Sequence, residues 1–135
     1  LDGDARCKMI TQGRSLRKPS GGLKQPFRKK RLYQMGSQPV MTKLGPKRRI
    51  RIDNVTGGAT RIRLLQTQVA NVYDPKSKKF VVAKIKTVSN NPANRYFTRA
   101  NIITRGAILD TELGKAKVTN RPGQDGVVNA VMMKQ

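Results

Sequence analysis

The chain has 135 residues, which predicts one domain with room for an appendage, and it carries 29 Lys and Arg against 7 Asp and Glu, a formal net charge of +22. One cysteine and no histidine exclude an internal disulfide framework and the usual zinc sites, zinc fingers included. A compact state this basic repels itself unless a polyanion neutralises it, and nucleic acid is the commonest such partner.

A membrane surface is the alternative polyanionic partner, and the sequence argues against it. Membrane binding would require an amphipathic basic helix or a lipid anchor, and neither is predicted. The longest apolar runs, at residues 80–83 and 131–133, are far too short to span a bilayer. Residues 1–10 are polar and charged and do not match a signal peptide. We therefore expect no membrane partner.

Residues 1–47 are predicted to form an extended basic arm. Residues 1–50 hold 14 basic and 2 acidic side chains, and Gly and Pro interrupt them without apolar periodicity. Few apolar side chains are available to offset the entropy of ordering such a segment. We expect the arm to be flexible alone and to become ordered on RNA, with at most a short helix around residues 28–35.

From residue 48 onward, a period-two pattern predicts strands. Residues 49–52 and 61–64 alternate Arg with Ile or Leu, and residues 80–88 alternate with β-branched side chains. Gly57-Gly58 and residues 74–77 carry turn signals.

The remaining elements are shorter. Asn91 and Pro92 look like a cap followed by Pro at the first helical position, which predicts one short helix as far as Arg99. Further strands are predicted at residues 69–73, at 102–110 with a bulge at Gly106, and after the turn at Leu113-Gly114, at 115–119 and 127–133, the last preceded by a loop at 120–126. The pattern predicts a mostly β protein: a small antiparallel β-barrel-like body over residues 48–135, with at most one or two short helices.

Four pairs of cations sit two residues apart on the predicted strands. Alternate side chains of a strand face opposite sides, so each pair shares one face. The pairs are Arg49/Arg51, Arg61/Arg63, Lys84/Lys86 and Lys115/Lys117. The interleaved residues, predicted to form the core, are Ile50, Ile52, Ile62, Leu64, Ala83, Ile85, Ala116 and Val118. Solvation of an outer face would explain any one pair, but four together favour a binding surface, because ordinary surfaces mix both signs.

Folded RNA fits this composition better than a single strand does. Aromatic residues make up 4% of the chain and Trp is absent, which argues against a base-stacking platform. Tyr33, Tyr73, Tyr96 and Phe97 could each stack on a base, but packing in the core or on the surface is the favoured interpretation for each. The predicted RNA-binding residues are Arg14, Arg17, Lys18, Lys24, Arg28, Lys29, Lys30, Arg31, Lys43, Lys47, Arg48, Arg49, Arg51, Arg61, Arg63, Lys84, Lys86, Arg95, Arg99, Arg105 and Arg121.

The sequence offers little for catalysis. It has no His for proton transfer, and its seven acids are scattered. Asp110 and Glu112 could share a strand face as a metal-binding pair, but two exposed acids balancing nearby Lys are the favoured interpretation. Cys7 lies in a polar segment and is interpreted as incidental. We predict no catalytic residue, no metal site, no cofactor and no small-molecule substrate.

Several motifs together resemble a known family, the small-subunit ribosomal protein eight of the archaeal–eukaryotic class. They are QGRSLRKPSGG at residues 12–22, VANV at 69–72, NPANR at 91–95, NIITRG at 101–106, ELGKA at 112–116 and RPGQDGVVNAV at 121–131. The last motif is the most specific, and the resemblance runs from about residue 12 to the end. The short length, without the insertion of eukaryotic members, indicates an archaeal-type member.

The resemblance implies a compact β-barrel-like body and a basic amino-terminal arm threaded into small-subunit rRNA. It also implies a structural role without catalysis, a cytoplasmic location in the ribosome, and neighbouring ribosomal proteins as partners. Two alternatives remain: a ribosome-maturation factor of the same family, and a DNA-compacting chromatin protein. The stretch at residues 14–22 favours the ribosomal member over the maturation factor.

Overall fold

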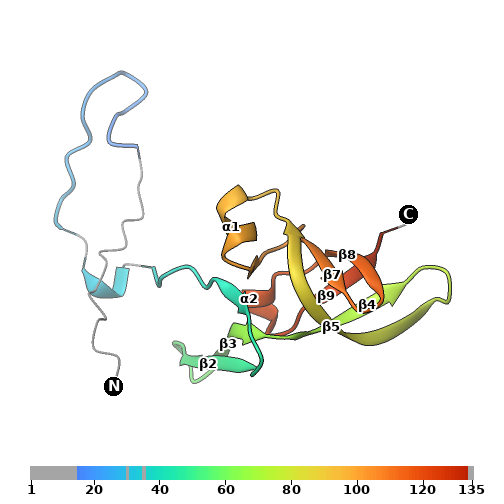
Figure 1. Ribbon diagram of the computed structural model, residues 1–135. Helices are drawn as coiled ribbons and strands as arrows, with labels where there is room; N and C mark the ends of the chain where they lie inside the picture. Colours follow the sequence, from blue (N-terminus) through green and yellow to red (C-terminus); the bar gives the residue numbers. More distant parts are fainter. Residues whose placement is uncertain (1–14, 30, 35, 134–135) are drawn as a thin grey trace. The chain divides into compact units, whose positions relative to one another are not determined.

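The computed structural model describes residues 15–29, 31–34 and 36–133, and the chain divides after Pro39 into two units (Figure 1). The predicted boundary lay after residue 47. In the structure, Thr42–Leu44, which the prediction placed in the arm, form a strand of the second unit.

The second unit contains a closed barrel of five strands, labelled in Figure 1. These are β4 (Val69–Asp74), β5 (Lys79–Asn90), β7 (Ile108–Thr111), β8 (Gly114–Val118) and β9 (Asn129–Met132). Consecutive strands around the barrel pair antiparallel, but the closing pair, β4 and β9, is parallel. An odd number of strands that alternate in direction must close with two strands running the same way. The predicted barrel is confirmed, with this one parallel seam.

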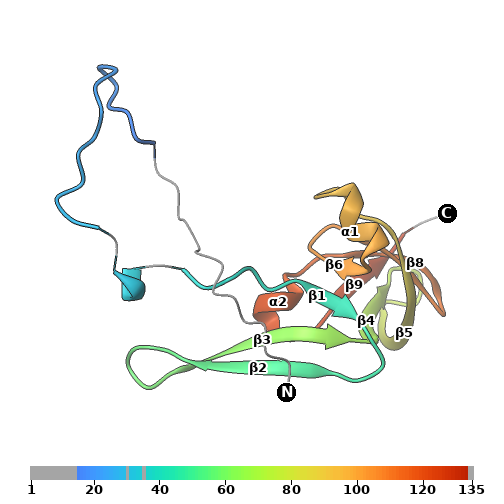
Figure 2. The same cartoon turned by 60° about the vertical axis from the view of Figure 1, so that its left-hand side comes forward.

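A second sheet has the strand order β2-β3-β1-β6. Its strands are β1 (Thr42–Leu44), β2 (Arg49–Asn54), β3 (Thr60–Thr67) and β6 (Ile102–Ile103). Figure 2 shows β2 and β3 as a long two-stranded ribbon, with β1 and the short helix α2 beside β3. Gly57 and Gly58 form the tip of this hairpin, both with positive φ, which confirms the predicted turn.

Helix α1 (Arg95–Arg99) begins later than predicted. Its N-cap is Asn94, whose side-chain oxygen accepts a hydrogen bond from the Tyr96 amide at 2.9 Å. Asn91 is buried instead: it donates to the Ile102 carbonyl at 3.1 Å and accepts from the Thr104 hydroxyl at 2.9 Å. Through these hydrogen bonds Asn91 connects the segment before the helix to Ile102 of β6 and to Thr104. The predicted helix start at Pro92 is wrong, because the helix begins at Arg95.

Two further boundaries differ from prediction. The strand predicted at residues 102–110 is two strands, because a turn at Gly106, with φ +84°, carries the chain from β6 in one sheet to β7 in the barrel. The loop predicted at residues 120–126 contains α2 (Pro122–Asp125), which has Pro at its start and ends at Gly126 in the left-handed conformation.

The buried core confirms part of the predicted set. Leu64, Ala83, Ile85, Ala116 and Val118 are all buried in one apolar cluster.

The three isoleucines of the hairpin do not belong to that core. Ile52 is 65% exposed, Ile62 is 44% exposed and Ile50 is 39% exposed. The cross-strand register places them on one side of the ribbon, as predicted, together with Leu64. Leu64 is buried in the core cluster and α2 contacts β3, but the three isoleucines stay partly open to water. Alternation correctly predicts which side chains share a face, but it does not show that another layer covers that face.

The first unit contains a small local turn. Lys24 N–H donates to the Leu16 carbonyl at 2.7 Å and Lys18 N–H to the Gly22 carbonyl at 2.8 Å, so residues 16–24 fold back around Gly21. The helix predicted around residues 28–35 is a single 3-10 turn, η1 (Leu32–Gln34). Every residue from 15 to 29 is exposed. The flexibility of the free arm stays a prediction.

Gly126 and Gly58 allow a matched test of how α2 packs on the hairpin. Their φ angles are +76° and +77°, so alanine at either position meets a left-handed cost of about 1–2 kcal/mol. A Cβ at Gly126 would also lie 2.9 Å from Ile62 Cγ2, whereas a Cβ at Gly58 has nothing within 4 Å. We expect Gly126→Ala to lower the free energy of unfolding by about 1 kcal/mol more than Gly58→Ala does. Denaturant unfolding of both variants measures this, and equal losses would contradict it.

Candidate nucleic-acid interface

The β2–β3 hairpin carries a cationic face. Arg51 lies opposite Arg63, and Asp53 lies opposite Arg61, so these four side chains share one side of the ribbon. Asp53 pairs with Arg51, Nε to Oδ1 at 2.9 Å, and with Arg63, Nε to Oδ2 at 3.5 Å. One carboxylate thus offsets the repulsion among three guanidinium groups, and the face stays positive. The Arg63 side chain is only 18% exposed, so Arg61 and Arg51 present most of the accessible charge.

The start of β2 is less regular than the sequence pattern suggested. The strand register shifts between Arg49 and Ile50. The regular alternation that predicts a shared face for Arg49 and Arg51 is therefore interrupted at this point. Arg48 donates from Nη2 to the Gly126 carbonyl at 3.0 Å. Arg48 therefore ties the hairpin to the end of α2, so it has a structural role besides any contact with RNA.

The barrel carries lysines on its outer side. Lys84 and Lys86 on β5 are exposed, and their neighbours Ala83 and Ile85 are buried. The same alternation holds on β8, where Lys115 and Lys117 are exposed between buried Ala116 and Val118. A closed barrel has an inside for every strand, so the predicted division between cationic and apolar faces is confirmed here.

The acids predicted to balance these lysines lie on and beside β7. Asp110 is opposite Lys115 and accepts a hydrogen bond from the Thr87 hydroxyl at 3.3 Å, while Glu112 is exposed. Among the residues that the structure describes, no three His, Cys, Asp or Glu side chains group together in a way that could hold a metal ion.

The cations around α1 and α2 are exposed. Arg95 stacks over the Tyr96 ring, 5.1 Å from Cζ to the ring centroid, and donates to the Tyr96 hydroxyl at 3.1 Å. Arg99 lies in the last turn of α1, where the helix dipole favours a cation. Arg105 is exposed beside Gly106, and Arg121 is exposed at the N-cap of α2.

The predicted cations of the first unit are also exposed where they are described, and they are Arg17, Lys18, Lys24, Arg28, Lys29 and Arg31. Arg17 Nη1 donates to the Gly21 carbonyl at 2.9 Å, and Arg28 Nη2 donates to the Tyr33 hydroxyl at 3.3 Å. Arg14 and Lys30 lie outside the described residues. In the second unit, Lys43 on β1 and Lys47 before β2 are exposed.

Few of these cations are paired with a carboxylate of the described residues. Across residues 15–29, 31–34 and 36–133, the ion pairs within 4.0 Å all involve one acid, Asp53. The other predicted cations there are exposed or partly exposed and have no ion pair with a described carboxylate, which is an arrangement that phosphate groups can satisfy.

The turn between β4 and β5 carries exposed cations that are not among the predicted RNA-binding residues. Lys76, Lys78 and Lys79 are all exposed at this end of the barrel, and the run Lys76-Ser77-Lys78-Lys79 in the sequence could have revealed them. Asp74 shapes the turn by accepting hydrogen bonds from the Lys76 amide and the Ser77 hydroxyl, both at 2.9 Å. These hydrogen bonds hold the pKa of Asp74 below its usual value of 3.8.

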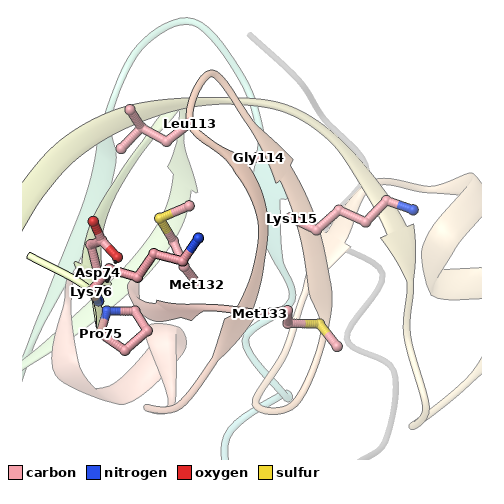
Figure 3. Close-up of a pocket in the computed structure, with 8 residues that line it drawn as sticks. All are labelled: Asp74, Pro75, Lys76, Leu113, Gly114, Lys115, Met132 and Met133. Atoms are coloured by element: carbon pink, nitrogen blue, oxygen red, sulfur yellow. Dashed lines mark hydrogen bonds between the residues drawn. The ribbon is translucent and has the colours of Figure 1, made fainter. Parts of the chain in front are cut away.

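A hollow of about 420 Å³ lies beside this turn (Figure 3). Figure 3 shows Leu113, Met132 and Pro75 around the opening, with Lys115 extending away from them. The hollow thus offers mainly apolar contacts, together with the Lys76 ammonium group.

No helix in the described part of the chain is long and apolar enough to cross a membrane.

A closed five-stranded barrel with many exposed cations, in a chain of net charge +22, is typical of a small, strongly basic β-barrel protein. The family model described as ribosomal protein S8e matches residues 11–133, and the chain belongs to this family.

Two archaeal relatives are similar over almost their full length. The small ribosomal subunit protein eS8 of Picrophilus torridus is 47% identical over 124 residues, covering 92% of this chain and 98% of that protein. The protein of the same name from Sulfolobus acidocaldarius is 48% identical over 124 residues, covering 92% of this chain and 97% of that protein. The predicted resemblance to an archaeal-type member is therefore confirmed.

Proposed function

We propose that the protein is a structural constituent of the small ribosomal subunit, in the cytoplasm, and that it binds and stabilises folded small-subunit rRNA. Membership of the S8e family and the names of two similar archaeal proteins support the ribosomal role. The exposed cations that form no ion pair with a carboxylate of residues 15–29, 31–34 and 36–133 support the proposed mode of binding.

In this mechanism, the cations neutralise RNA phosphates and release condensed counterions. Such contacts fix the position of a protein on RNA without reading its sequence. The barrel and the hairpin are held by backbone hydrogen bonds, which supports a proposed surface whose backbone at Lys84 and Arg61 is ordered before RNA binds. The arm is proposed to order on the RNA, since its described side chains form no core of their own.

The proposal involves no catalytic step and no cofactor. Its partners are small-subunit rRNA and the neighbouring ribosomal proteins. The proposed contact residues are the predicted cations, together with Lys76, Lys78 and Lys79 of the β4–β5 turn. Arg48 and Arg63 are expected to contribute less, because one is bonded to the Gly126 carbonyl and the other is largely covered beside Asp53.

A competition experiment separates this function from a DNA-compacting role. The protein is titrated with small-subunit rRNA of Sulfolobus acidocaldarius, and duplex DNA of equal phosphate content is added as competitor at one fixed salt concentration. We expect folded rRNA to be retained, because cations in a fixed arrangement suit one folded shape better than a uniform duplex. Displacement by an equal amount of DNA would overturn the proposal.

Sedimentation separates a structural constituent from a maturation factor. A constituent is expected to remain with mature small subunits through a high-salt sucrose gradient. Release at high salt, with the protein found only on immature particles, would support the maturation factor instead.

A further inference from the structure

The outer side of the barrel carries an apolar and aromatic patch that the cationic interface does not use. It lies across β4, β5 and β9, which are neighbours in the barrel (Figure 1). Tyr73 is opposite Phe80 on β5 and Val131 on β9, and Asn71 is opposite Val82 and Asn129 in the same way. Directly opposite residues share a face of the sheet, so these six side chains form one surface, the β4–β5–β9 patch.

Two members of the patch are strongly exposed. Phe80 is 77% exposed and Val82 is 70% exposed. The Phe80 and Tyr73 rings lie 5.0 Å apart at an angle of 46°, so Tyr73 supports one side of the Phe80 ring. An open hollow of about 510 Å³ runs between Tyr73, Phe80 and Val131 and the two asparagines. Covering these rings would remove a large apolar area from water, which favours a bound partner.

The polar groups around the patch indicate what kind of partner fits. Asn71 Nδ2 donates to Asn129 Oδ1 at 3.2 Å, and such an amide pair offers both donors and acceptors beside the rings. Lys84 lies two residues beyond Val82 on β5, and Lys117 lies opposite Val131 on β8. The outward positions of β4, β5 and β9 from residues 69 to 73, 80 to 86 and 129 to 131 include no acid.

We propose that the β4–β5–β9 patch is a stacking site for one unpaired RNA base, an inference that rests on the proposed function. The base lies against the Phe80 ring, and the edge of the base contacts the Asn71 and Asn129 amides. The backbone phosphates next to this base contact Lys84 or Lys117. Aromatic rings beside cations are the usual parts of a site for unpaired nucleotides. Protein interfaces, by contrast, are depleted in lysine.

The test compares Phe80→Leu, which keeps an apolar side chain without a ring, with the matched control Phe80→Tyr, which keeps the ring. The probe is deproteinised small-subunit rRNA of Sulfolobus acidocaldarius. Stacking on an aromatic ring contributes about 1–3 kcal/mol per base, so Phe80→Leu is expected to weaken binding by about fivefold or more. Phe80→Tyr is expected to bind as the unchanged protein does. Thermal melts establish that all three proteins are equally folded.

Two further readouts distinguish the possible failures. Short-wavelength ultraviolet light should cross-link a base to Tyr73 or Phe80, and the salt dependence of binding should be the same for Phe80→Leu as for the unchanged protein, since no phosphate contact is lost. If the unchanged protein does not bind rRNA, the proposed function fails. If it binds and Phe80→Leu binds equally well, the stacking site is overturned. Equal binding with poor incorporation of Phe80→Leu into subunits would assign the patch to a protein neighbour, and would overturn it too.

Discussion

Affinity for small-subunit rRNA is expected to fall by ~10³–10⁵ as monovalent salt rises from about 50 to about 200 mM, if ~6–10 phosphates are neutralised. The reason is the net charge of +22, of which only the arginines beside Asp53 are paired with a carboxylate in the described part of the chain. Filter binding across a salt series gives the slope of log affinity against log salt. A slope near zero would remove the electrostatic account.

The double variant Lys84→Gln, Lys86→Gln tests whether these two lysines contribute to the salt dependence of RNA binding. Both side chains are exposed and lie beyond 4.0 Å from any described carboxylate, so their removal disturbs no ion pair. Each lost phosphate contact is expected to reduce the slope by about 1. Because the side chains are exposed, the free energy of unfolding is expected to change by less than about 0.5 kcal/mol. An unchanged slope in a folded variant would mean that these lysines are only solvated, and that the arm and hairpin bind the RNA.

The sequence predicted the barrel strands well because each strand of a closed barrel has one covered side. The alternation of Lys84 and Lys86 with Ala83 and Ile85 was sufficient to assign both faces of β5 correctly. The same reasoning was wrong for Ile52 and Ile62, because whether a second layer covers the ribbon depends on residues far away in the chain.

Local signals near residue 91 were ambiguous for a similar reason. Asn91 and Asn94 are both residues that can cap a helix. Pro92 directly follows Asn91, which locally favours a helix that starts there. Asn91 Oδ1 accepts a hydrogen bond from the Ala93 amide at 3.1 Å, the same local bond that Asn94 makes with the Tyr96 amide, so this bond does not decide where the helix starts. What distinguishes Asn91 is its burial and its contacts with the Ile102 carbonyl and the Thr104 hydroxyl, which are distant in sequence. Sheet membership, which splits β6 from β7 at Gly106, likewise cannot be read from local propensity.

For the candidate interface, composition and periodicity identified the cations but not their surroundings. The bond from Arg48 to the Gly126 carbonyl joins residues 78 positions apart, and no pattern near Arg48 indicates it. Because alternate side chains of a strand share a face, the sequence alone could have predicted that Phe80 faces outward on the same side as Lys84. Only the register of β4 against β5, however, shows that Tyr73 lies beside it.

The last prediction compares Leu64→Asp with Ile62→Asp, two substitutions on the same face of β3. Leu64 is 0% exposed and belongs to the core cluster, so an aspartate there places an unpaired carboxylate among apolar side chains. That burial is expected to cost several kcal/mol, on the order of 3 or more, and to unfold the second unit. Ile62 is 44% exposed, so an aspartate there keeps contact with water and is expected to cost about 1 kcal/mol. Thermal melts followed by circular dichroism measure both.

Leu64→Ala serves as the control for lost volume, because it removes the same apolar contacts without adding a charge. It is expected to cost about 2–5 kcal/mol, less than Leu64→Asp. Ile62→Asp should remain folded and should retain rRNA binding, apart from the repulsion between one new carboxylate and the phosphates. If Ile62→Asp unfolds as readily as Leu64→Asp, the isoleucine face of the hairpin must be covered in solution. Arg61 and Arg63 would then meet the RNA from a ribbon that is packed on its other side, not from one open to water on both.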